Sequence, residues 1–192
     1  AVMAVVFVTV STIGTGASVF DDGSRTLRSR TDAVLDNTYH NLTPVLPFSQ
    51  NWTDAALITA DDNWLTAPSI IGYRGDNLTA TTGTDPQTIL VDDVAVVDVN
   101  ANRSDPGVFN TGGVSEFDGI TNPVVAFQGS GTADAPHLDL HFNTAGCASP
   151  ANTGNISYNL RDLDPSADDA IQRVALQYRV GTTGDFTNIA AG

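Results

Sequence analysis

The sequence predicts a mainly β protein: an antiparallel β-sandwich of the jelly-roll or immunoglobulin-like type, preceded by a long N-terminal helix. Two observations predict this division. Residues 1–42 contain no proline, and all 9 prolines follow, so we expect an assembly segment over 1–43 and a β domain over 44–192. From Thr43 on, short apolar runs alternate with Pro, Gly, Asn and Asp, which is typical of all-β domains.

The N-terminal segment is apolar at its start and amphipathic afterwards. The run AVMAVVFVTVSTIG precedes a polar stretch in which Phe20, Leu27 and Val34 recur at heptad spacing, and this predicts a helix with one apolar face. The β-branched residues at the start favour the alternative, an extended strand donated to the sheet of a neighbouring subunit. The residues expected to make assembly contacts are Val5, Val6, Phe7, Val8, Val10 and Ile13.

The same segment is expected to be retained. The charged start of a signal peptide is absent, although Gly16-Ala17-Ser18 imitates a cleavage site. The apolar run is shorter than the roughly 20 residues that a membrane-spanning helix needs. We therefore expect a transient membrane contact of this segment rather than a permanent anchor.

Apolar runs predict the strands of the β domain. They are Ala55–Thr59, Thr88–Val99, Val124–Gln128, His137–Phe142, Asn155–Leu160 and Ile171–Val180. The last is the clearest, because from Val174 to Val180 apolar and more polar residues alternate, which predicts that valine, leucine and tyrosine face the core. A hairpin with Gly184-Asp185 in its turn should follow. Because the sequence stops in that hairpin, we expect one unfilled sheet edge.

The charge is strongly acidic. Asp and Glu number 22 and the 8 basic residues are all arginine, which gives a net charge of −14. Such a surface repels phosphate, so we expect no nucleic-acid partner. Asn-X-Ser/Thr triplets are acceptors for glycans in an exported protein. They begin at Asn41, Asn51, Asn77, Asn102 and Asn155.

An acidic stretch near the C-terminus has oxygen side chains at alternate positions, a spacing with which a short loop can wrap calcium. These positions are Asp162, Asp164, Ser166 and Asp168. Ala167 and Arg173 stand where an EF-hand requires glycine and glutamate. The alternatives are therefore an irregular calcium site, the only cofactor we expect, and an acidic loop without metal.

A second metal candidate lies in one predicted strand. His137, Asp139 and His141 should share one face of that strand and offer ligands to a transition metal. The alternative is the plain alternation of a half-buried strand.

No catalytic motif is recognisable, so we expect no enzyme. The serine-hydrolase elbow, the His-Glu-x-x-His motif and the phosphate-binding loop are absent, and Cys147, the single cysteine, has no evident activating partner. Adjacent carboxylates at 61–62 and 92–93 would point to opposite faces of a strand. Aromatic residues are candidates for a carbohydrate-binding face, with core packing as the alternative. These are Trp52, Trp64, Tyr73 and Phe109.

Two stretches resemble known proteins. The runs PFSQNWTDAALITADDNW, IIGYRGDNLTATTGTDPQTIL, GGVSEF, VVAFQGSGTADAPHLDLHFNTAG and NISYNLRDLDPSADDAIQRVALQYRVGTTGDFTNIAAG resemble an uncharacterised β-rich module of large secreted bacterial proteins, some of which carry extracellular nuclease or lamin-tail-type domains. This resemblance covers about residues 47–192 and implies export, but no activity. Residues 1–42 resemble the N-terminal helix of type IV pilin-like proteins, although Ala1 and Val5 replace the usual phenylalanine and glutamate.

Together these patterns predict an exported structural subunit of a pilus-like extracellular filament, a homo-oligomer assembled through its N-terminal segment. The first alternative is a ligand-binding or carbohydrate-binding module of a secreted hydrolase or nuclease. The second is a calcium-dependent adhesin domain. All three place the protein outside the cell or at its surface.

Overall fold

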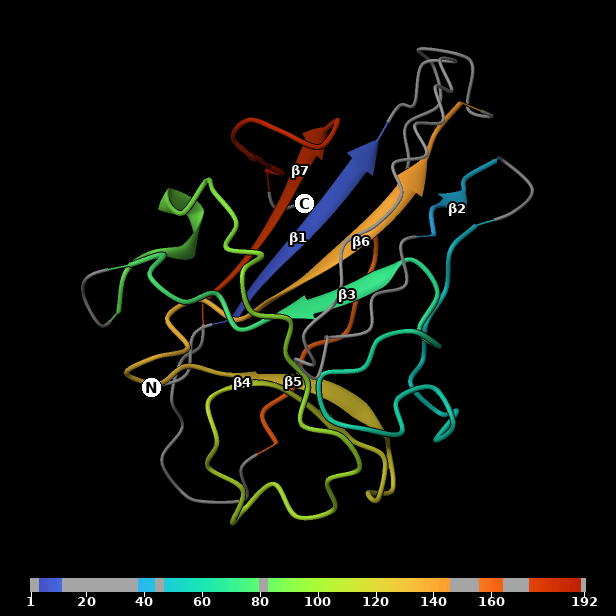
Figure 1. Ribbon diagram of the computed structural model, residues 1–192, viewed down its shortest axis with the longest axis vertical. Coiled ribbons are helices and arrows are strands. Elements are labelled where there is room, and N and C mark those ends of the chain that lie inside the picture. The colour runs from blue at the N-terminus through green and yellow to red at the C-terminus, as the bar shows by residue number, and fades with distance from the viewer. Residues whose placement is uncertain are drawn as a thin grey trace, which may run out of the picture.

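The computed structural model describes residues 4–11, 38–43, 47–79, 83–145, 156–163 and 173–190. These residues form two β-sheets and one short 3₁₀ helix, η1 (Pro86–Thr88), and contain no α-helix (Figure 1). No helix in this part of the chain is long and apolar enough to cross a bilayer. The prediction of a mainly β fold is confirmed.

The larger sheet has a parallel centre. Its strands are β1 (Ala4–Ser11), β2 (His40–Asn41), β3 (Ile70–Tyr73), β6 (His137–Asn143), β7 (Val174–Val180) and β8 (Thr187–Asn188). Strand β1 lies between β6 and β7 and runs parallel to both, as the three long arrows of Figure 1 show. Strand β2 is parallel to β6, whereas β3 is antiparallel to β6 and β8 is antiparallel to β7. The expectation of a wholly antiparallel architecture is therefore wrong for this sheet.

The helix expected at the start of the chain is wrong for residues 4–11, which form strand β1. Four of the eight residues in AVVFVTVS are valine, and β-branched side chains fit a pleated sheet better than a helix. The strand pairs with β6 and β7 of its own chain, so the expected assembly segment and the expected β domain share one sheet. The remainder of the expected helix lies outside the described residues.

The smaller sheet consists of β4 (Gly113–Phe117) and β5 (Val124–Gln128), which are antiparallel. One cluster of buried residues joins the two sheets, and we call it the apolar core: Ile58, Trp64, Ala67, Ile70, Ile71, Tyr73, Val99, Ala101, Val114, Val125 and Leu138. A Cβ atom at Gly72 would lie 2.4 Å from Cζ2 of Trp64. Glycine at this position of β3 therefore lets the indole pack directly against the strand.

The predicted strands have mixed outcomes. The strand predicted over Val124–Gln128 has the same bounds as β5. The strands predicted over His137–Phe142 and Ile171–Val180 correspond to β6 and β7. The C-terminal hairpin is confirmed in β7 and β8. Of the other predictions, 55–59 and the described part of 155–160 contain no strand, and 88–99 contains only an isolated bridge at Val97.

Aspartate side chains explain two of these failures. The carboxylate of Asp54 accepts a hydrogen bond from the backbone N–H of Ala56, and Asp93 does the same for Ala95. Such Asx turns compete with strand pairing. Among the strands that the sequence did not indicate, β3 and β4 contain Gly72 and Gly113, and glycine is not a strand signal.

Candidate functional site

The position of β1 is the most unusual feature of the sheet. We call the space between β6 and β7, which β1 fills, the β1 slot. Strand β1 makes seven register pairs with each neighbour. The pairs with β6 begin with Val5 beside His137, and the pairs with β7 end with Val10 beside Val180. In the described part of the chain β6 and β7 do not pair with each other. Without β1, both would expose a free edge of backbone N–H and C=O groups.

Polar residues line both sides of the slot on one face of the sheet. On β6 they are His137, Asp139 and His141, and on β7 Gln177 and Arg179 occupy the matching positions. Phe7 of β1 is the register partner of both Asp139 and Gln177. His137, Asp139 and Gln177 are nevertheless buried. Together with Asp92 and Arg179, these three residues form what we call the polar layer.

The face prediction for β7 is thus inverted. Ala175 and Gln177 are buried, whereas Tyr178 and Val180 are exposed. The reason is a long-range contact: the segment that includes η1 covers the polar face, and Gln177 Nε2 donates to the carbonyl oxygen of Ile89 at 3.0 Å. Period-two alternation shows which residues share a face, but not which face another segment will cover.

Two oppositely charged side chains meet in the polar layer. Arg179 Nη2 lies 2.8 Å from Asp92 Oδ2, and the two side chains are only 10% and 17% exposed. The same guanidinium lies over the ring of Phe186, 4.3 Å from its centroid. A largely buried ion pair therefore lies against β7.

Asp139 lies beside this pair and is 3% exposed. Burial, together with the carboxylate of Asp92, raises its pKa to about 8 against the opposing effect of Arg179. Its Oδ1 atom has no hydrogen-bond partner. Asp139 is therefore protonated and neutral at pH 7, because the effect of burial exceeds the attraction of Arg179.

His137 responds in the opposite direction. It is fully buried, and burial lowers its pKa to about 4 although its Nδ1 lies 2.9 Å from the carbonyl oxygen of Ala135. Its ring packs against Tyr73, with centroids 5.4 Å apart. The imidazole is thus neutral over most of the pH range.

The polar layer constrains the register of the strands that border the slot. A buried polar row tolerates only the register that satisfies it, because a slip by one residue would place every side chain on the other face. Oxygen Oε1 of Gln177, Nε of Arg179 and Oδ1 of Asp139 are buried without hydrogen-bond partners, so the layer has unused bonding capacity.

The predicted metal sites receive no support from the described residues. In this part of the chain no group of three or more His, Cys, Asp or Glu residues could hold a metal ion. His137, Asp139 and His141 do share a face, as expected, but that face is covered. Asp162 is exposed, while Asp164, Ser166 and Asp168 lie outside the described residues.

The glycosylation candidates lie where glycans could be attached. Asn41, Asn51, Asn77 and Asn102 are all exposed, which an acceptor asparagine requires. Asn155 lies outside the described residues, as do Ile13 and Cys147. The other assembly residues, Val5, Val6, Phe7, Val8 and Val10, all belong to β1.

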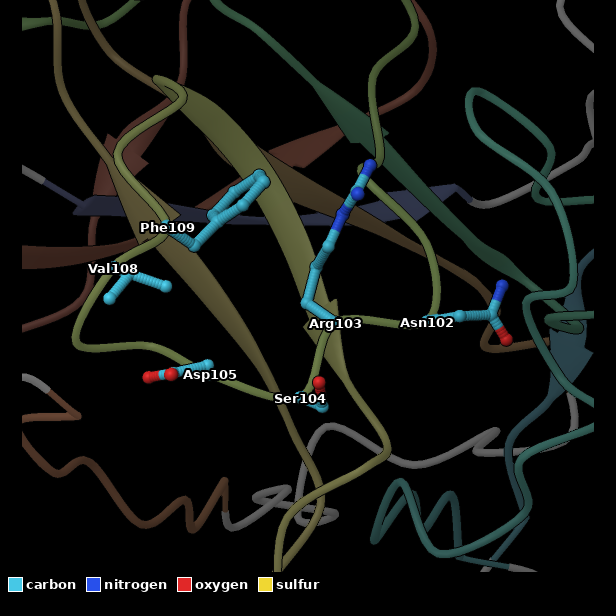
Figure 2. A pocket seen from close by; sticks show the side chains of 6 residues that line it. All are labelled: Asn102, Arg103, Ser104, Asp105, Val108 and Phe109. Atoms are coloured by element: carbon cyan, nitrogen blue, oxygen red, sulfur yellow. The ribbon is translucent and has the colours of Figure 1, made fainter.

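The aromatic candidates separate into two groups. Trp64 and Tyr73 belong to the apolar core, and Trp52 packs edge-on against Trp64, so these three have the structural role. Phe109 instead lines an open hollow together with the residues that follow Asn100 (Figure 2).

Sequence reasoning missed Gln177 and Arg179, which it assigned to the solvent face of the last strand. It considered Asp92 only as one of two adjacent carboxylates. One sequence signal pointed to Arg179. It is one of only 8 basic residues in a strongly acidic chain, and it lies in the strand that the sequence predicts most clearly. No family model, curated protein or solved structure matches this chain, so both sequence resemblances remain predictions.

Proposed function

We propose that this protein is an exported structural subunit of a pilus-like extracellular filament, in which β1 of one copy fills the β1 slot of the next. The observation that carries the proposal is the central position of β1, which comes from the start of the chain yet supplies the middle strand of the larger sheet. Exchange of an identical element between copies preserves every contact and therefore costs little free energy.

The length of the chain between β1 and the rest of the sheet supports this exchange. Residues 12–37 separate Ser11 from Thr38, and a stretch of that length can span at most about 90 Å. A domain of this chain length has a radius of gyration of about 16 Å. The connection is therefore long enough for β1 to reach a neighbouring copy, while the β-rich remainder forms the outward-facing head, which we take to be a sandwich.

A subunit with an empty β1 slot is unfavourable. A chain whose slot is empty exposes two long strand edges at the centre of its sheet, and such edges recruit any available strand. Filling by the chain's own β1 closes the subunit, and filling by a neighbour's β1 propagates a chain of subunits. The exposed acceptor asparagines and the acidic charge support an extracellular location.

Disulfide trapping tests which copy supplies β1. Val8 and Tyr178 are register partners, and parallel partners are close enough for a disulfide. In a Cys147→Ser background, the pair Val8→Cys and Tyr178→Cys should give a ladder of covalent oligomers on a non-reducing gel. The matched control is Tyr178→Cys with Thr187→Cys, partners within the β7–β8 hairpin, which should give only a monomer band.

Two outcomes would overturn the proposal. One is a monomer band from both pairs, which would show that β1 stays in its own sheet. The other is the persistence of filaments, in negative-stain micrographs, after deletion of residues 1–11, because that variant has no strand to donate.

A further inference from the structure

Strand β5 forms the outer edge of a hydrogen-bonded array that begins in the larger sheet. The N–H of Asp98 donates to the carbonyl oxygen of Gly72 in β3 at 3.0 Å. The N–H of Asn100 donates to the carbonyl oxygen of Val114 in β4 at 2.9 Å. Strand β4 pairs in turn with β5, and both strands lie below β3 in Figure 1. Within the described residues β5 pairs with β4 alone, so its other side is an open edge.

The hydrogen bonds of β4 show which groups of β5 point to this open edge. The carbonyl oxygen of Val114 accepts from Asn100, and the N–H of Glu116 donates to the carbonyl oxygen of Asn100, so both β4 residues direct backbone groups away from β5. Their register partners are Phe127 and Val125. In an antiparallel pair, partners of this kind both point away from the shared side. The N–H and C=O groups of Val125 and Phe127 therefore face outward, and no described residue forms a hydrogen bond with them.

The edge lacks the features that protect sheet edges from pairing with other chains. Such protection comes from charged side chains, from proline or from a very short strand. At the opposite end of the larger sheet, β8 is protected because it contains only 2 residues. Strand β5 has 5 residues, VVAFQ, without a charge or a proline, in a chain of net charge −14. Four of the five are partly exposed, so a second strand can approach.

A second copy of β5 matches this edge. When two β5 strands are antiparallel with Ala126 of each copy on a two-fold axis, Val125 of one copy lies opposite Phe127 of the other. Both residues direct their N–H and C=O groups outward, so the two Val125–Phe127 pairs form four hydrogen bonds and use every outward group. Pairs of aromatic and β-branched residues stabilise neighbouring strands, and no like charges face each other.

We propose that β5 is a self-association edge, at which two copies of the chain join their sheets antiparallel about Ala126. The closed two-fold contact uses the same surface of both copies. In a filament it would link heads laterally. It involves β5 rather than β1, so this pairing and the exchange of β1 can each fail without the other.

Disulfide trapping at the two-fold axis tests the pairing. In a Cys147→Ser background, Ala126→Cys supplies one thiol per chain, so any disulfide is intermolecular. Residues that face each other without hydrogen bonds in an antiparallel pair have Cα atoms about 4.5 Å apart, which suits a disulfide. Under mild oxidation this variant should run mainly as a covalent dimer on a non-reducing gel.

The matched control is Gln128→Cys in the same background. Gln128 lies on the same strand and the same face as Ala126, and it is also partly exposed. In the proposed register the two copies of Gln128 are offset by four positions, about 13 Å along the strand. A disulfide requires Cα atoms within roughly 7 Å, so this variant should stay monomeric on the gel. Monomer bands from both variants, or equal dimer bands from both, would overturn the proposal.

Hydrogen exchange of the unchanged chain gives an independent readout. So small an interface implies a dissociation constant on the order of 100 µM, which protein concentrations of about 10 µM and 1 mM bracket. The N–H groups of Val125 and Phe127 should exchange about tenfold more slowly at the higher concentration, because only association pairs them. Those of Val124 and Ala126 face β4 and should not depend on concentration. Slow exchange of the outward groups at both concentrations would show that the same chain covers the edge, and fast exchange at both would show that nothing does. Either result overturns the proposal.

Discussion

The apolar core and the polar layer are both buried, yet they consist of opposite kinds of side chain. The apolar core places Trp64, Ile70 and Val114 between the two sheets with almost no exposed surface. The polar layer places a carboxyl group, an amide and an ion pair against the edges of the β1 slot. The first region joins β3 to β4 and β5, and the second borders the strand that we propose is exchanged.

The difference separates stability from specificity. Apolar burial contributes about 25 cal/mol per Å² and does not depend on pH. A buried polar layer contributes little net free energy, because desolvation offsets its internal bonds, but it is sensitive to register and to protonation. The head of the protein should therefore persist whether or not the slot is filled, while the proposed exchange of β1 should be sensitive to changes in the polar layer.

The largest effect should come from the apolar core. Trp64 is fully buried, and its indole N–H donates to the carbonyl oxygen of Asp98 at 3.1 Å. Trp64→Ala should lower the free energy of unfolding by about 4 kcal/mol, through the lost burial and the cavity left behind. Urea denaturation at one fixed protein concentration measures it. The neighbouring Leu65 is 53% exposed, and Leu65→Ala should change stability by less than about 0.5 kcal/mol. Equal losses from both substitutions would mean that the core is not where we place it.

The ion pair of the polar layer should give the next largest effect. Arg179→Gln leaves the carboxylate of Asp92 buried without its cation, and this should cost about 3 kcal/mol of unfolding free energy. The matched control is Arg173, whose ion pair with Asp85 is exposed at 64% and 42%. Arg173→Gln should cost less than about 0.5 kcal/mol. If the two arginine variants unfold at the same urea concentration, the polar layer does not differ from the surface in energy.

Much of the fold could be predicted from local patterns. The strands β5, β6 and β7 were predictable because apolar and β-branched residues recur there between turn residues. Strand β1 was available as an alternative for the same reason. The heptad spacing of Phe20, Leu27 and Val34 favours a helix, but extending it back over the valine-rich start predicts the wrong structure for residues 4–11. The structure of such a short segment depends less on its intrinsic propensity than on the strands with which it pairs, here β6 and β7.

The candidate site could be predicted only in part. The sequence indicated that His137, Asp139 and His141 share a face, because a strand has period two. It could not indicate that Asp92 would pair with Arg179, 87 residues away along the chain, or that η1 would cover Gln177. Those contacts depend on the path of a loop, which carries no periodic signal. The hollow at Phe109 was likewise hidden, since it depends on where the loop folds back on β4.

The third prediction concerns pH and has the smallest effect. Asp139 has an ordinary pKa of 3.8 and a folded value of about 8, so between these values only the folded state holds its proton. Stability therefore falls as pH rises through this range. His137 has an ordinary pKa of 6.5 and a folded value of about 4, and over that interval its contribution rises with pH and offsets that of Asp139. Asp98, with a folded pKa of about 6, has lost most of its proton by pH 6.5 and contributes little above that pH.

Between about pH 6.5 and pH 8 Asp139 makes the largest contribution, and the free energy of unfolding should fall by about 1.5 kcal/mol across that window. Urea denaturation at closely spaced pH values measures the slope. Asp139→Asn replaces the carboxyl group by a neutral group of the same shape, so the fall in stability should disappear while stability at pH 8 rises above that of the unchanged chain. The apolar core supplies the comparison, because Leu65→Ala should leave the slope as it is. A flat profile for the unchanged chain would mean that Asp139 reaches water when the protein is folded, and the polar layer would then be an open surface rather than a buried lining of the slot.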